Sequence, residues 1–167
     1  MNLYLLRHGL AVELGSPGYN KDADRPLTPQ GRRKIKKVAT GLRALDLSFD
    51  LILSSPYARA RETAELVASG LGIKRRLQMC DALVPGARFK ALIDLIHHLE
   101  PAPQELLLVG HEPYLSDLIS LLLSGEIGLS LTMKKGGLCK LAIESLQLGR
   151  CATLEWLTTP GQLRAAA

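Results

Sequence analysis

Two short apolar runs, far apart in the chain, each lead into a turn that carries a histidine. Leu3–Leu6 is followed by a turn with His8, and Leu106–Val109 is followed by a turn with His111. Both runs have the length and the apolar composition of buried β-strands. The carboxyl ends of parallel strands face one shared crevice, and ligands bind there. Since the chain has only four histidines, two of them at strand ends predict a common site at one edge of a parallel sheet.

A third apolar run predicts a further contribution to the same crevice. Leu51–Leu53 has the pattern of a strand, and Arg59 lies in the first turn of the helix predicted after it. Free backbone N–H groups at that helix start favour an anion. We therefore expect Arg7, His8, Arg59 and His111 to meet in one pocket. Imidazole and guanidinium groups together suit the binding and transfer of a phosphoryl group.

The chemistry of such a pocket assigns a role to each of these side chains. His8 is the expected nucleophile: a neutral imidazole nitrogen attacks phosphorus, and water then hydrolyses the phosphohistidine. Neighbouring guanidinium groups disfavour the imidazolium and so keep His8 neutral near pH 7. Arg7 and Arg59 are expected to grip the phosphoryl oxygens, while His111 donates a hydrogen bond to them in the transition state.

Helical and strand patterns that alternate along the chain predict the fold class. Thr28 and Pro29 are typical of a helix start, and apolar residues spaced three or four apart follow them. The alternation indicates an α/β protein, a three-layer α/β/α sandwich with a mostly parallel sheet. The last two predicted strands, Leu138–Glu144 and Thr153–Leu157, are too close in sequence for a parallel crossover, which needs about a dozen residues or more. An antiparallel C-terminal strand is therefore expected.

The length and the cysteine pattern limit the organisation of the chain. Its 167 residues fit one domain over residues 1–160, followed by a tail at 161–167. The three cysteines are scattered and form no CxxC motif, and no cluster of ligands indicates a metal site. We therefore expect a cytoplasmic protein without a metal or another cofactor. No uncharged apolar stretch reaches the roughly 18–20 residues of a membrane span, and the first apolar run is too short for a secretory signal.

The charge of the chain favours anionic partners. Its formal net charge is +5, and basic residues gather in Arg32–Lys37 and in Lys74–Arg76. A basic nucleic-acid-binding module is therefore one hypothesis. A platform for single strands interleaves aromatic with basic residues, whereas aromatics make up only 4% of this chain. Solvated helix faces are the better interpretation of both segments, so neither a nucleic acid nor a membrane is expected as a partner.

Four motifs, taken together and in this order, give the chain a resemblance to the histidine phosphatase superfamily, also called the phosphoglycerate mutase-like family. The motifs are Arg7–Gly9, Arg25–Thr28 with Gly31, Ser54–Pro56 with Arg59, Ala60 and Thr63, and Gly110–His111. The resemblance covers nearly the whole length and implies the phosphoglycerate mutase-like fold. It places the nucleophilic histidine of the family on His8 and its phosphate pocket on Arg7, Arg59 and His111.

Within the superfamily, the chain is similar to the short bacterial phosphohistidine phosphatases of the SixA type. It is compact, and the longer acid-bearing insert of the mutases is not recognisable. The match at Arg25–Thr28 implies that Arg25 is turned toward the phosphate. Such enzymes remove phosphate from a histidine on a signalling protein, typically a phosphotransfer domain. The alternatives are a phosphatase for a small ester, such as a sugar phosphate or a nucleotide, and a catalytically silent phosphoprotein-binding relative, which would lack one of these groups.

The proton donor is the least defined part of the predicted site. Expelling an alkoxide from a phosphate ester needs a donor of suitable pKa. Asp81 is the first candidate, near a point where many relatives carry a glutamate, and a turn or cap role explains it equally well. Glu112, beside His111, is the second candidate, and a carboxylate at a helix start is its better interpretation. An imidazole leaving group depends less on such a donor than an alkoxide does, which favours phosphohistidine as the substrate.

Overall fold

One six-stranded sheet organises the computed structural model, which describes residues 1–167. The strands are β1 (Asn2–Arg7), β2 (Leu51–Ser54), β3 (Leu77–Met79), β4 (Glu105–Gly110), β5 (Leu138–Ile143) and β6 (Ala152–Thr158). Their spatial order is β3-β2-β4-β1-β5-β6, and β1, β2, β3 and β4 all run parallel. Parallel neighbours need long crossover connections, which helices supply here.

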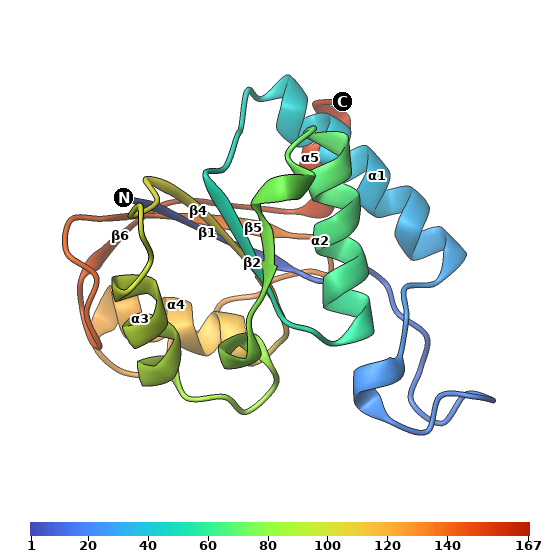
Figure 1. Ribbon diagram of the computed structural model, residues 1–167, viewed down its shortest axis with the longest axis horizontal. Coiled ribbons are helices and arrows are strands. Elements are labelled where there is room, and N and C mark those ends of the chain that lie inside the picture. Colours follow the sequence, from blue (N-terminus) through green and yellow to red (C-terminus); the bar gives the residue numbers. More distant parts are fainter.

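Helices cover both faces of the sheet (Figure 1). They are α1 (Pro29–Ala44), α2 (Ala58–Gly70), α3 (Phe89–His97), α4 (Tyr114–Ser124) and α5 (Pro160–Ala165), with the 3-10 turns η1 (Asp22–Asp24), η2 (Lys74–Arg76) and η3 (Asp81–Leu83). One face packs against α1, α2 and α5, and the other packs against α3 and α4. The predicted α/β/α sandwich is confirmed. None of the helices combines the length and the apolar surface needed to cross a lipid bilayer.

Two hydrophobic cores follow from the two-residue period of the central strands. In β1, Leu3 and Leu5 pack into the core beneath α3 and α4, while Tyr4 and Leu6 pack into the core beneath α1 and α2. The residues of β4 alternate in the same way. Central parallel strands are buried on both faces and therefore have nearly continuous apolar sequences. The apolar runs that predicted the strands thus form the middle layer of the sandwich.

β5 is the strand that runs against the others. It pairs antiparallel with β1 on one side and with β6 on the other, so β6 runs in the same direction as β1. The predicted antiparallel pairing of the last two strands is confirmed, and the strand that opposes the rest of the sheet is the first of that pair. The connection between β5 and β6 is too short for a parallel crossover.

The prediction of a tail at residues 161–167 is wrong, because most of this segment belongs to α5. The Thr159 side chain accepts the backbone N–H of Gln162, whose side chain accepts the backbone N–H of Thr159 in return. Leu163 is only 1% exposed, in the core beneath α1 and α2. A Cβ atom at Gly41 would lie 1.8 Å from the Leu163 carbonyl oxygen. The glycine therefore permits close contact between α1 and α5.

The carboxyl ends of the three central strands lie level with one another. Arg7 at the end of β1 pairs with Gly110 at the end of β4, and Ser54 at the end of β2 pairs with Val109. The N–H group of the next residue after β1 and after β2 also donates to a carbonyl of β4. The turns that follow these strands consequently begin at one edge of the sheet.

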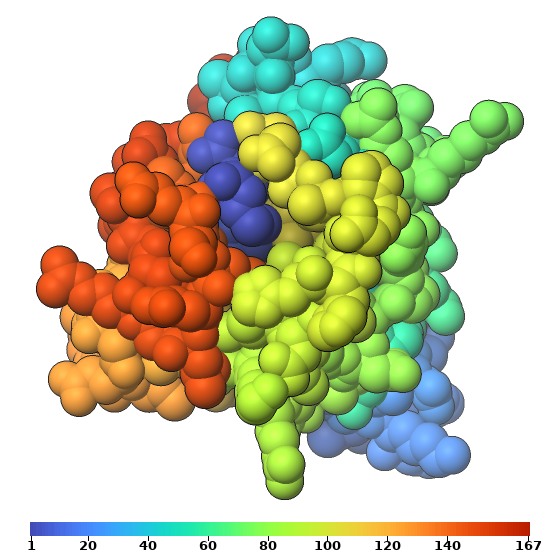
Figure 2. All heavy atoms as spheres, turned by 60° about the vertical axis from the view of Figure 1, so that its left-hand side comes forward, coloured from blue at the N-terminus to red at the C-terminus, as the bar shows by residue number.

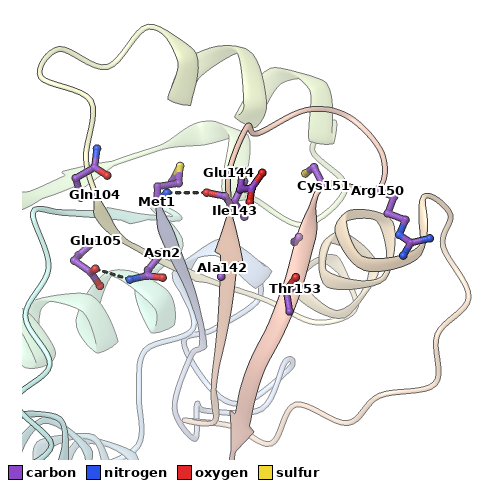
Figure 3. A pocket seen from close by; sticks show the side chains of 11 residues that line it. Met1, Asn2, Gln104, Glu105, Ala142, Ile143, Glu144, Arg150, Cys151 and Thr153 are labelled. Atoms are coloured by element: carbon purple, nitrogen blue, oxygen red, sulfur yellow. Dashed lines mark hydrogen bonds between the residues drawn. The ribbon is translucent and has the colours of Figure 1, made fainter.

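A surface cavity of about 610 Å³ lies at the opposite edge of the sheet. Its lining includes Met1 and Gln104, before β1 and β4, and Cys151, before β6 (Figure 3). Figure 2 shows the N-terminal residues, in dark blue, between yellow and orange-red segments of the chain. The terminal ammonium group of Met1 donates to the Ile143 carbonyl at 2.7 Å. No histidine lines this cavity, because His8 and His111 lie at the other edge, beyond the carboxyl ends of β1 and β4.

We expect Leu163→Ala to destabilise the protein by about 2–4 kcal/mol, because it removes a buried side chain that joins α5 to the core. Urea unfolding followed by circular dichroism measures the change. Leu148→Ala is the matched control, since Leu148 is 55% exposed and its truncation should cost less than about 0.5 kcal/mol. Equal stability of the two variants would contradict the docking of α5.

Candidate active site

His8 directly follows β1, and its ring is fixed in one tautomer. Nδ1 lies 2.7 Å from the Gly9 carbonyl oxygen. Because a carbonyl oxygen only accepts hydrogen bonds, Nδ1 carries the proton and Nε2 carries the lone pair. The N–H of Gly9 donates to Thr63 Oγ1 at 3.0 Å, so α2 holds this turn in place. A neutral imidazole with an unprotonated Nε2 is the form that attacks phosphorus.

Burial holds His8 in this neutral form. It lowers the pKa of His8 from 6.5 to about 3, although the hydrogen bond with the Gly9 carbonyl opposes the change. Electrostatic interactions with His111, Arg59 and Arg7 lower the pKa further. The expected effect of the guanidinium groups on His8 is therefore present with the predicted sign. Desolvation is the larger cause, and it depends on packing that the sequence motif does not show.

His111 follows β4 and faces His8 across the pocket. The two ring centroids are 5.2 Å apart. Nε2 of His111 lies 2.8 Å from Ser55 Oγ, and that oxygen also accepts the N–H of Tyr57. In the tautomer in which the Ser55 hydroxyl donates to Nε2, the proton of the neutral His111 ring is on Nδ1. Nδ1 is buried without a partner in the protein and can donate to an oxyanion.

Arg59 lies in the first turn of α2 and reaches back over the pocket. Its side chain is only 4% exposed. Nε donates to His8 Nε2 at 3.2 Å, while Nη1 and Nη2 donate to the backbone oxygen and the carboxylate of Asp22 at 2.7 and 2.9 Å. Cζ lies 5.4 Å from the centroid of the Tyr57 ring. Arg59 and the two histidine-bearing turns thus lie together at the ends of β1, β2 and β4, where the strand pattern placed them.

Arg7 ends β1 and adds a second cation, which is partly buried. Its Nη1 donates to the Met133 carbonyl at 2.7 Å, and its Nε is buried without a partner. Arg7 Nε and His111 Nδ1 are the only buried side-chain nitrogen or oxygen atoms in the chain that lack a hydrogen-bond partner. An unpaired buried polar group costs roughly 1–3 kcal/mol. Two such donors next to His8 therefore indicate a place for a ligand with acceptor oxygens.

Asp22 connects Arg25 to Arg59. Arg25 donates from Nε and Nη2 to Asp22 Oδ1 at 2.8 and 2.6 Å, and from Nη1 to the Val12 carbonyl. The other carboxylate oxygen, Oδ2, accepts from Arg59. Partial burial raises the pKa of Asp22, but the hydrogen bonds from Arg25 and Arg59 outweigh it, so this pKa lies below its ordinary value. Arg25 thus lies beside the pocket, with an ionised carboxylate between it and Arg59.

The two predicted proton donors make no contact with the histidines of the pocket. Asp81 begins η3, is exposed, and forms no hydrogen bond or ion pair with the pocket residues. Glu112 accepts the N–H of Ser116 at 3.1 Å, which is the helix-start role that the sequence favoured. His97 and His98, at the end of α3, bind the backbone carbonyls of Leu146 and Asp94 and lie outside the pocket.

The sequence motifs assign no role to three pocket residues: Asp22, Ser55 and Tyr57. Ser55 belongs to a motif that was recognised, but its bond to His111 depends on the spatial order of β2 and β4. Asp22 precedes Arg25 by three residues, which is one turn of a 3-10 helix. That spacing was the available signal, and the turn-rich segment around it has no periodicity that would single it out.

The stability of the protein should fall on acidification below pH 6.5. Burial lowers the pKa of His8 and of His111 to about 3 in the folded protein, whereas a histidine in an unfolded chain has a pKa near 6.5. The unfolded state therefore binds more protons between these values, and each histidine contributes about 2 kcal/mol to the loss between pH 7 and pH 5. Urea unfolding at both pH values measures it. His8→Asn should lose about 2 kcal/mol less than wild type, and an identical loss would contradict the neutral buried ring.

Comparisons with known proteins agree with this arrangement. The sequence model of the histidine phosphatase superfamily (branch 1) matches residues 3–84. An uncharacterized protein of Picosynechococcus sp. is 38% identical over 139 residues, which cover 83% of this chain and 82% of that protein. A phosphohistidine phosphatase SixA homolog of Haemophilus influenzae is 28% identical over 128 residues, which cover 72% of this chain and 76% of that protein.

A solved structure has the same fold over almost the whole chain. It is that of the protein histidine phosphatase SixA complexed with tungstate, with a TM-score of 0.81 and 23% identity. The match covers 98% of this chain and 99% of that one, and it agrees with the phosphoglycerate mutase-like fold expected from the motifs. The family match at residues 3–84 includes Arg7, His8, Arg25 and Arg59. The chain belongs to the histidine phosphatase superfamily.

Proposed function

We propose that the protein is a phosphatase that forms a covalent phosphohistidine on His8 and removes phosphate from a histidine of a signalling protein, such as a phosphotransfer domain. One observation carries the proposal. The Nε2 lone pair of a neutral His8 lies beside Arg59 and His111, and the charge of Arg7, whose Nε is unpaired, acts on the same ring. A nucleophile surrounded by oxyanion donors suits phosphoryl transfer, in which positioning and charge stabilisation supply most of the catalysis.

The first half-reaction is the attack of His8 Nε2 on phosphorus. A nitrogen–phosphorus bond forms on His8 while the bond to the substrate imidazole breaks. When the other nitrogen of the substrate ring is already protonated, the ring leaves as neutral imidazole and takes no proton from the enzyme. Arg7 and Arg59 neutralise charge on the phosphoryl oxygens, and the Nδ1–H group of His111 donates to one of them.

The second half-reaction returns His8 to its starting form. Since Nδ1 keeps the proton that it shares with the Gly9 carbonyl, the phosphorylated His8 ring is an imidazolium, which is a good leaving group. Water attacks phosphorus, the nitrogen–phosphorus bond breaks, and its electron pair returns to Nε2. Both protons of the water molecule leave with the product as dihydrogen phosphate. The cycle balances without a general acid from the enzyme.

The carboxyl groups near the pocket support a phosphohistidine substrate over an alkyl ester. Asp22 is held ionised by Arg25 and Arg59, and Glu112 is bound to the start of α4. Asp81 makes no contact with the pocket and remains a predicted donor that substitution can test. An alkoxide leaving group needs a protonated acid close to its oxygen, whereas a protonated imidazole does not.

The same proposal includes the conditions under which the protein works. Arg7, Arg25 and Arg59 supply the positive charge that a metal ion supplies in other phosphoryl-transfer sites, so we propose a metal-independent reaction. We propose the cytoplasm as its location, because three unpaired cysteines suit a reducing compartment. A phosphorylated protein is the proposed partner, and neither a nucleic acid nor a membrane is.

His8→Asn should lower kcat by at least about 10³-fold, because the variant has no nucleophile and keeps only the phosphate-binding groups. Mass spectrometry after a quench that avoids acid should detect one phosphate on wild-type His8 and none on the variant. His97→Asn, on the far end of α3, is the matched control and should retain wild-type turnover. Full activity of the His8 variant would refute the covalent mechanism.

The catalytic efficiency should follow the leaving group of the substrate. We expect kcat/KM to fall from a phosphohistidine phosphotransfer domain to an aryl phosphate to a sugar phosphate, with about 10²-fold or more between the first and the last. Asp81→Asn should leave phosphohistidine hydrolysis unchanged. Steady-state release of phosphate measures all three substrates with each variant. A preference of orders of magnitude for the sugar phosphate or a nucleotide would instead establish the small-ester phosphatase.

A further inference from the structure

Asp22 accepts hydrogen bonds from Arg25 and Arg59, two of the arginines proposed to bind the phosphate oxygens. Every guanidinium nitrogen of Arg59 already donates a hydrogen bond, one to His8 and two to Asp22. Every guanidinium nitrogen of Arg25 is also engaged, two with Asp22 and one with Val12. A phosphoryl group that binds the N–H groups now directed at Asp22 therefore has to replace those bonds.

The carboxylate of Asp22 also balances the charge of this cluster. Arg25 and Arg59 are like charges that share one carboxylate, with one oxygen for each. The side chain of Arg59 is 4% exposed, whereas that of Asp22 is 40% exposed. Asp22 therefore lies between a buried cation and the solvent. If the carboxylate were removed and nothing replaced it, the positive charges of Arg25 and Arg59 would lie close together without the negative charge that now balances them.

The segment that carries Asp22 is built to move without disturbing the core. Its two ends are joined by a bridge between Ala11 and Leu27, which are 7% and 1% exposed. Between them, η1 contains no buried residue, and Figure 1 shows this blue segment extending away from the sheet. A segment with few buried apolar contacts opens at low cost in free energy. The base of the segment is therefore fixed, while Asp22 can withdraw.

We propose that Asp22 stands in for the phosphoryl group in the free protein and is displaced when a phosphate dianion binds Arg25 and Arg59. This inference rests on the proposed function, since it needs a phosphoryl group at these arginines. It makes Asp22 a specificity-determining residue. A ligand with a single negative charge gains little by replacing a carboxylate that is already in place, whereas a dianion forms stronger charge-assisted bonds with the same donors.

Asp22→Asn tests this role, because it removes the charge and keeps the size of the side chain. Isothermal titration with inorganic phosphate should show about tenfold tighter binding than wild type, since the internal competitor is lost. The variant should melt at a lower temperature without phosphate, and added phosphate should raise its melting temperature more than that of wild type. Asp24→Asn is the matched control: Asp24 lies on the same 3-10 turn, is exposed and forms no ion pair, so its variant should behave as wild type.

Unchanged or weaker phosphate binding by Asp22→Asn would overturn the proposal, and weaker binding would make Asp22 a support that orients the arginines. If Asp22→Asn folds only when phosphate is present, while Asp24→Asn folds without it, the result supports the displacement of Asp22 by phosphate. Failure to fold at every phosphate concentration contradicts it. The proposed function fails separately: wild type would then neither bind phosphate nor hydrolyse phosphohistidine. Wild-type hydrolysis with unaltered phosphate affinity in Asp22→Asn rejects the role of Asp22 alone.

Discussion

Parallel pairing of β1, β4 and β2 in one register determines where every reactive group lies. His8, Ser55 and His111 each come one residue after a strand, and the ends of those strands are level. Successive side chains along a strand point to opposite faces, so a slip of one residue would exchange the two cores of the sandwich. Such a slip would also turn Tyr4 into the other core and break the bond from its hydroxyl to Glu105. The packing of residues without any chemical role therefore fixes the geometry of the pocket.

The parts of the site that could be predicted are those attached directly to this sheet. An apolar run followed by His8 or His111 identifies both a strand and the residue at its end, and Arg59 is recognisable at the start of the next helix. Asp22 could not be found in this way, because the segment between β1 and α1 shows neither the two-residue period of a strand nor the 3.6-residue period of a helix. The docking of α5 was missed for a related reason. Its one buried leucine, Leu163, stands among glycine and alanine residues and forms no repeating apolar pattern. The strength of desolvation at His8 depends on surroundings drawn from several elements.

The pocket combines features that lower stability with features that a phosphoryl group would satisfy. Two buried donors, Arg7 Nε and His111 Nδ1, have no partner, and burial keeps both imidazoles neutral. Such costs are tolerated where they serve binding or catalysis, because the rest of the fold compensates for them. The carboxylate of Asp22 reduces the cost on one side of the pocket, where Arg25 and Arg59 would otherwise lack an anion. The two unpaired donors remain available to the oxygens of such a group.

The proton on Nδ1 of His8 links this geometry to the choice of substrate. Because the Gly9 carbonyl retains that proton, only Nε2 can be phosphorylated, and the phosphorylated ring carries a positive charge. A protonated phosphohistidine on another protein is the same chemical group. Transfer between the two therefore exchanges one imidazolium for another, close to symmetrically, and needs no acid to protonate the leaving group. An alkyl ester would break this symmetry, since its oxygen needs a donor, and Asp22, the carboxylate that binds Arg59, is held ionised by two arginines. The tautomer of one buried ring and the charge state of one loop residue thus favour the same class of substrate.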